Sequence, residues 1–85
     1  MYQVLLKSSA QKELRKLPGL PLKKMAQVLD ELGNAPRPHG CKKLLTSKIA
    51  LWRIRIGNYR MIYHIDDHAQ VVEVLRIAHR REVYN

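Results

Sequence analysis

The chain has 85 residues, of which 46% are hydrophobic and 27% are charged. This length and composition fit one folded domain over residues 1–85 and exclude a second domain, a deep cofactor cleft and intrinsic disorder. No apolar run approaches the roughly 20 residues that cross a bilayer, and the N-terminus lacks a signal-peptide pattern, so we expect a cytoplasmic protein without a membrane partner. The formal charge of +9 predicts a polyanionic partner, either a nucleic acid or an acidic protein.

The first 34 residues are expected to form one strand and two helices. Residues 2–7 are an apolar run rich in strand formers, and Ser8-Ser9 can cap the start of a helix. Apolar residues at helical spacing predict a short amphipathic helix over residues 10–17, ended by a Pro-Gly pair. A second helix begins near Pro21 and carries an apolar stripe as far as a Gly-Asn pair at residues 33–34. The two helices are expected to form a hairpin.

The remainder of the chain changes to strand periodicity. A loop at residues 35–40 contains two prolines and separates the helices from the sheet. Residues 43–46 form either a short strand or the entry to one, and residues 71–77 are apolar on both faces, as expected at the centre of a sheet. The predicted fold class is therefore α+β, with an N-terminal strand, a helical hairpin and then an antiparallel sheet of three to four strands.

The clearest strand pattern is a hairpin over residues 50–65. Its first strand alternates apolar residues with Arg53 and Arg55, so that one face is expected in the core and the other is basic. Gly57-Asn58 is typical of a two-residue turn with glycine in the first central position. This turn sets a register in which Arg55 lies opposite Arg60, with Arg53 on the same face.

The distribution of basic residues points to the hairpin as the place for chemistry. All eight lysines lie within residues 7–48, whereas six of the eight arginines lie within residues 53–81. Arginine grips a phosphate through a planar fork of donors, while lysine is a solvated point charge. Arg53 and Arg55 are about 6.6 Å apart along the strand, and facing like charges destabilise a sheet unless an anion offsets them. The pattern indicates phosphate binding; the alternative is a solvated basic face without a ligand.

Other candidate residues lie in the C-terminal tail and outside the hairpin. The tail, residues 79–84, can deliver Arg80 and Tyr84 beside the arginines of the hairpin. His39 and Cys41 have metal-ligand spacing but lack two further ligands, so neither a metal nor a cofactor is expected. His64 is expected to be structural. Two aromatic residues could stack on bases, but their face of the hairpin favours packing in the core: Trp52 and Tyr63.

The order of elements, together with the segments WRIRIGNYRMIY and HRREVY, resembles the RelE toxins of type II toxin–antitoxin systems, in the RelE/ParE superfamily. The resemblance covers nearly the whole chain and is most specific at residues 57–63 and 79–84. It implies an mRNA interferase: a ribosome-dependent endoribonuclease that cuts messenger RNA, inhibits translation, contacts 16S ribosomal RNA and is silenced by a cognate antitoxin. The site residues that it implies are Arg53, Arg55, Arg60, Arg80 and Tyr84.

Where the best-known member of that family has lysines, this chain has Arg53 and Arg55. Because arginine does not give up its proton, these residues are assigned to positioning the substrate and stabilising the phosphorane. Attack of a ribose 2′-hydroxyl on the adjacent phosphate needs a base and an acid but no metal. Tyr84 is the preferred base, although a free phenol has a pKa near 10 and needs nearby arginines to favour its anion. His79 is the alternative, since histidine exchanges protons near neutral pH.

Two other functions stay open from the sequence. One is a ParE-like toxin of the same fold that inhibits DNA gyrase without cutting RNA, and the other is a non-catalytic RNA-binding module. The tail with Arg80 and Tyr84 favours the nuclease, because an inhibitor needs no proton carrier there. The helical lysines are interpreted as solvated faces that can also dock on ribosomal RNA: Lys12, Lys16, Lys23 and Lys24.

Overall fold

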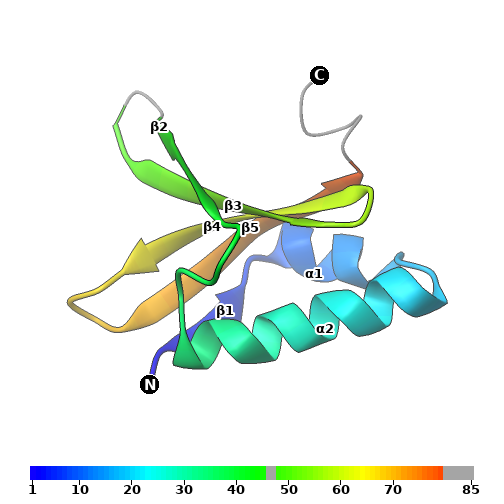
Figure 1. Ribbon diagram of the computed structural model, residues 1–85, viewed down its shortest axis with the longest axis horizontal. Coiled ribbons are helices and arrows are strands. Elements are labelled where there is room, and N and C mark those ends of the chain that lie inside the picture. Colours follow the sequence, from blue (N-terminus) through cyan, green and yellow to red (C-terminus); the bar gives the residue numbers. More distant parts are fainter. Residues whose placement is uncertain (46–47, 80–85) are drawn as a thin grey trace.

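The computed structural model describes residues 1–45 and 48–79 of the chain. The described part is an α+β domain (Figure 1), which confirms the predicted fold class. Its elements, in chain order, are β1 (Gln3–Leu6), α1 (Ser8–Arg15), α2 (Gly19–Asn34), β2 (Lys42–Leu45), β3 (Ala50–Ile56), β4 (Tyr59–Asp66) and β5 (Val71–His79). No helix within these residues is long and apolar enough to span a membrane.

The described strands form one sheet of five strands in the order β1-β5-β4-β3-β2. Neighbouring strands are antiparallel except for β1 and β5, which run parallel. The predicted count of three to four strands was too low, because the N-terminal strand also joins the sheet. It does so beside β5, where the backbone N–H of Gln3 donates to the carbonyl of Gln70 at 2.9 Å. The helical hairpin carries the chain from β1, at one edge, to β2, at the other.

Both helices lie against the same face of the sheet, and β2 and β3 rise away from them (Figure 1). The core fills the space between the helices and this face. The apolar residues predicted at helical spacing supply one side of it, and the alternating residues of the strands supply the other. The most deeply buried members are Ala10, Met25, Leu32, Met61, Tyr63, Val72, Val74 and Ile77. We call the opposite side of the sheet the helix-free face.

The start of α1 differs from the sequence prediction. Ser8 is the first helical residue, and the preceding Lys7 occupies the N-cap without a side-chain hydrogen bond. The expected serine cap was wrong because Ser9 uses its hydroxyl elsewhere: it donates to the carbonyl of Leu75 in β5 at 3.1 Å. Helix α2 begins at Gly19, so Pro21 lies in its first turn as predicted.

The β3–β4 hairpin has the predicted turn and register. Gly57 has a φ of 60°, a conformation that glycine adopts without the steric penalty of a side chain. Ile56 lies opposite Tyr59, and the pairing continues from there without a shift between β3 and β4. Strand β2 starts one residue earlier than predicted and pairs with β3, while Thr46 lies outside the described residues.

Candidate active site

The hairpin brings three arginines to the helix-free face. Arg55 lies opposite Arg60, and Arg53, two residues earlier, lies opposite Ile62. Because side chains alternate along a strand, these arginines point away from Ile54, Ile56 and Met61, which are buried in the core on the helix side. The register predicted from the turn is confirmed. We call Arg53, Arg55 and Arg60 the arginine cluster.

Two members of the arginine cluster are buried, which the sequence did not predict. Arg53 is 7% exposed and Arg60 is 6% exposed, whereas Arg55 is exposed. Arginine is almost never buried to this extent unless its donors are paired, and burial restricts the rotamers of its long side chain. The cluster therefore combines two guanidinium groups held in place with a third that is open to solvent.

A lysine that the sequence reasoning missed lies at the edge of the arginine cluster. Lys42 of β2 is directly opposite Arg53, and its side chain is exposed. Its strand has four residues and no clear alternation, so the sequence offered no signal that would assign it to a face. The pairing extends the positive charge of the helix-free face across β2, β3 and β4.

His64 shares the helix-free face but lies apart from the arginine cluster. It is opposite Glu73 of β5 and four residues along β4 from Arg60, a separation of about 13 Å. Its side chain is half-buried. This position agrees with the structural role expected for His64.

The structure does not bring His79 to the arginine cluster. His79 ends β5 opposite Tyr59, and their rings meet edge to face with centroids 5.5 Å apart. Together with Glu13 of α1 and Lys16 directly after it, the two rings line a cavity of about 420 Å³ on the helix-facing side of the strand ends. The two remaining candidates, Arg80 and Tyr84, lie outside the described residues.

The aromatic pair of the hairpin packs in the fold. Tyr63 is fully buried, and its hydroxyl donates to the carbonyl of Pro36 at 3.0 Å. Burial raises the pKa of the Tyr63 phenol above its usual value. Trp52 packs on the edge of the core, with the guanidinium of Arg37 4.9 Å from its ring centroid. The sequence interpretation of both aromatics as packing residues is confirmed.

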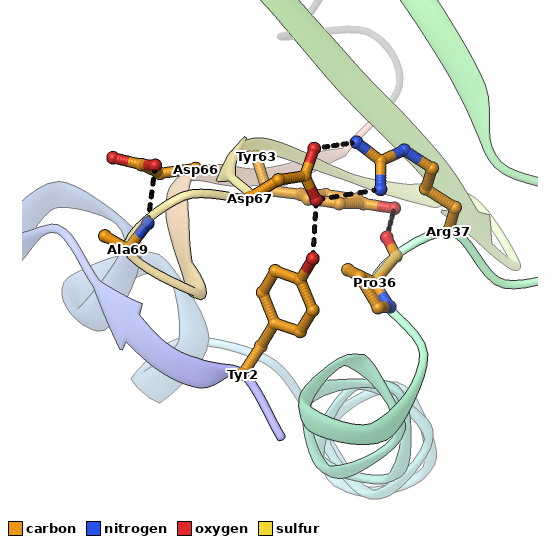
Figure 2. A network of polar contacts seen from close by, with 7 residues as sticks. All are labelled: Tyr2, Pro36, Arg37, Tyr63, Asp66, Asp67 and Ala69. Carbon is orange, nitrogen blue, oxygen red and sulfur yellow. Dashed lines mark hydrogen bonds and ion pairs between the residues drawn. The ribbon is translucent and has the colours of Figure 1, made fainter.

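A polar network anchors the proline loop beside these aromatics. In this network Tyr2, near the N-terminus, and Arg37, in the loop, both contact Asp67, which follows β4 (Figure 2). Arg37 donates to both carboxylate oxygens of Asp67, at 2.7 and 3.1 Å, and the Tyr2 hydroxyl donates to one of them at 2.5 Å. The hydrogen bonds from Arg37 and Tyr2 lower the pKa of Asp67 to about 2. The hydrogen bond to Asp67 raises the pKa of the Tyr2 phenol. The network lies on the helix-facing side and is structural.

Within residues 1–45 and 48–79, no group of three or more His, Cys, Asp or Glu side chains is arranged to hold a metal ion. The helix-free face carries the guanidinium groups of the arginine cluster, with Lys42 beside Arg53 and His64 further along β4. Guanidinium groups can bind a phosphate and stabilise charge that develops on it, but they do not exchange protons at neutral pH. The three arginines of the cluster therefore need a proton carrier other than themselves.

Comparisons with known proteins give a consistent result over nearly the full length. The family model described as "ParE toxin of type II toxin-antitoxin system, parDE" matches residues 4–84. The toxin RelG of Mycobacterium tuberculosis is 32% identical over 84 residues, which cover 98% of this chain and 95% of RelG.

Two solved complexes contain similar folds. The archaeal RelE-RelB complex from Pyrococcus horikoshii matches with a TM-score of 0.83 and 28% identity, over 93% of this chain and 94% of that one. The toxin-antitoxin complex RelBE2 from Mycobacterium tuberculosis matches with a TM-score of 0.79 and 31% identity, over 93% and 98% of the two chains.

Proposed function

This chain belongs to the ParE toxin family and is a type II toxin–antitoxin toxin of the RelE/ParE superfamily, and from this membership we propose that it is a ribosome-dependent mRNA endoribonuclease. The observation that carries the proposal is the arginine cluster, in which Arg55 faces Arg60 and two of the three guanidinium groups are buried. Such an arrangement is unfavourable for a sheet by itself and suits a polyanion that bridges the charges.

The proposed reaction is attack of a ribose 2′-hydroxyl on the adjacent phosphate, which expels the 5′-oxygen of the next nucleotide. The phosphorane gains negative charge as the new bond forms. Arg53 and Arg60, held by burial, are placed to stabilise that charge without reorganising, and the exposed Arg55 helps bind the substrate. Arg80 of the tail is proposed to add a further guanidinium.

Tyr84 is proposed as the base that takes the proton of the 2′-hydroxyl, and we keep His79 as the alternative. The contact between the rings of His79 and Tyr59 supports this order, because it turns the imidazole toward the helix-facing cavity. A phenol surrounded by arginines has its anion favoured by their positive charge, which brings its pKa closer to neutrality.

The proposed partners follow from charge and from the relatives. One of the similar structures is a RelE-RelB complex and another is the toxin-antitoxin complex RelBE2, and we propose that this chain likewise binds a cognate antitoxin. The ribosome is the proposed site of action, with 16S ribosomal RNA as a polyanionic contact. Exposed lysines on the two helices, or directly after α1, are available for that contact: Lys12, Lys16, Lys23 and Lys24.

Inhibition of DNA gyrase is the second candidate, since the matching family model describes ParE toxins. A reconstituted translation reaction tests the nuclease: the proposal expects new mRNA 5′ ends that appear only when ribosomes and the toxin are both present. A supercoiling reaction with the same protein tests the inhibitor. Intact mRNA together with blocked supercoiling would reverse the order of the two candidates.

A non-catalytic RNA-binding module is the third candidate, and its expected results differ from those of the other two. It predicts salt-sensitive RNA binding with intact mRNA and normal supercoiling.

A further inference from the structure

Strand β5 contains one more residue than β4, with which it pairs. Tyr63 of β4 lies opposite Val74, but the preceding Ile62 lies opposite Arg76, so Leu75 is the extra residue of a β-bulge. A bulge shifts the alternation of every side chain that follows it in the strand. This one occurs four residues before β5 ends at His79.

The bulge decides which residues of β5 lie next to the arginine cluster. Strict alternation would put Arg76 opposite Met61 in the core and Ile77 opposite Arg60. With the bulge, Ile77 lies opposite Met61 and is buried, and Ala78 lies opposite Arg60. The smallest of these side chains therefore sits beside the buried guanidinium, where a bulkier one would compete with it for space.

Helix α1 supplies the hydrogen bonds that hold the bulge. β1 pairs with β5 only as far as Val74, so the edge of β5 beyond that point needs other partners. The Ser9 hydroxyl donates to the carbonyl of Leu75 at 3.1 Å, and a carboxylate oxygen of Glu13 accepts the backbone N–H of Ile77 at 2.9 Å. Ser9 and Glu13 are four residues apart on α1, so both side chains point at the same edge.

Glu13 also binds the side chain of Arg76. The Nε of Arg76 donates to the carboxylate at 2.9 Å, and a terminal nitrogen forms an ion pair with it at 2.9 Å. The Arg76 side chain is 46% exposed, so solvent weakens the ion pair. The hydrogen bond from the backbone of Ile77 is part-buried and charge-assisted, and it acts directly on the bulge.

We propose that Glu13 is a positioning residue for the arginine cluster: through the backbone N–H of Ile77 it fixes the bulge of β5. In that register Ala78 lies beside Arg60, and β5 ends at His79, from which the C-terminal residues continue. The catalytic consequence rests on the proposed nuclease function, whereas the effect of Glu13 on the register of β5 does not.

Three variants separate the contacts of Glu13. Glu13→Ala removes both the backbone bond and the ion pair, while Glu13→Gln keeps an oxygen that can accept the N–H of Ile77. Arg76→Ala is the matched control, since it removes the ion pair and leaves the backbone bond. Each variant is compared with wild type by hydrogen exchange of the Ile77 amide and by the cross-strand nuclear Overhauser contact between Met61 and Ile77.

The inference expects about tenfold faster exchange of the Ile77 amide in Glu13→Ala and a weakened contact with Met61. Cleavage in the translation reaction should lose about tenfold or more in kcat with little change in KM, because the binding surface stays while its geometry loosens. Glu13→Gln and Arg76→Ala should stay near wild type in both readouts. Rescue by glutamine separates positioning from a need for negative charge.

Unchanged exchange of the Ile77 amide in Glu13→Ala would overturn the inference, as would an equal loss of cleavage in Arg76→Ala. If Glu13→Ala does not fold, Glu13→Asp replaces it, since the shorter side chain keeps the charge but withdraws the acceptor from Ile77. Wild-type protein that cuts no mRNA would refute the proposed function, and the exchange and Overhauser data would still decide the role of Glu13 in the register.

Discussion

Arg55 and Arg60 lie directly opposite each other on β3 and β4, and Arg60 is 6% exposed. Like charges in facing positions destabilise a sheet by about 0.2–1 kcal/mol, and a buried guanidinium has in addition lost its hydration. Facing like charges that work against stability are typical of a functional site, where a bound ligand or a transition state brings negative charge to them. Substitutions in the arginine cluster test this interpretation of the helix-free face.

Replacement of Arg60 should affect cleavage more than folding. We expect Arg60→Ala to lower the rate of mRNA cleavage by about 10²–10³-fold, the usual effect of removing one preorganised donor from a transition state. Arg60→Lys should recover part of the rate, because it keeps the charge but not the planar fork. Rates in a translation reaction and urea unfolding curves measure the two effects separately.

Arg15 of α1 provides the control for loss of positive charge, since it is exposed on the other side of the molecule. Arg15→Ala should cut mRNA at close to the wild-type rate. An equal loss of rate in the two alanine variants would mean that total charge, and not the arginine cluster, governs the reaction.

The identity of the base can be decided by two substitutions in the C-terminal region. Tyr84→Phe removes the phenol oxygen alone and should lower kcat by about 10²-fold or more, because general-base catalysis contributes on that order. His79→Gln should lower it far less, since the ring of His79 contacts Tyr59 on the helix-facing side. Single-turnover cleavage measures both, and the reverse ranking would make His79 the base.

Acid should weaken the polar network through Asp67. Its pKa falls from the usual 3.8 to about 2, chiefly through hydrogen bonding from Arg37. A carboxyl group with a lowered folded-state pKa contributes stability that is complete above its unfolded pKa and is lost as pH falls through the folded value. The wild-type unfolding free energy should therefore drop more steeply between about pH 4 and pH 2 than that of Asp67→Asn.

Asp66→Asn is the control for this pH series. Asp66 accepts the backbone N–H of Ala69 at 2.9 Å (Figure 2), a bond that an amide oxygen can also accept. Its variant should follow the wild-type pH dependence. Parallel curves for wild type and Asp67→Asn would show that the contacts with Arg37 and Tyr2 are not coupled to folding.

The buried phenol of Tyr63 should stabilise the fold without a role in cleavage. Tyr63→Phe removes the hydrogen bond to the carbonyl of Pro36, and we expect it to lower the unfolding free energy by about 1 kcal/mol. Cleavage should be unchanged, because Tyr63 points into the core and away from the arginine cluster. Urea denaturation measures the first effect, and a lost cleavage rate at unchanged stability would contradict the assignment.

Local patterns in the sequence predicted the hairpin well. The turn at Gly57-Asn58 fixes the pairing of β3 with β4, so the position of Arg55 opposite Arg60 follows from the sequence alone. Helix α2 could be predicted equally well from the sequence, since its apolar stripe and Pro21 lie within one segment. Features of this kind depend on neighbours in sequence.

Features that depend on distant segments were not predicted. The parallel pairing of β1 with β5 joins residues about 70 positions apart, and no local signal specifies it. Ser9 was expected to cap α1, but its hydroxyl bonds to Leu75 across the fold. The burial of Arg53 and Arg60 is likewise a tertiary property, since strand alternation assigns a face but not how deeply that face is covered.

The proposed function depends above all on the chain cutting mRNA on the ribosome by 2′-hydroxyl attack. The sharpest test is cleavage of an mRNA bound to ribosomes, with a single 2′-O-methyl group at the mapped scissile nucleotide as the only difference between two substrates. We expect a 2′,3′-cyclic phosphate at the new 3′ end of the unmodified mRNA and no cut at the methylated nucleotide. Equal cleavage of the two substrates, or none of either, would refute this mechanism.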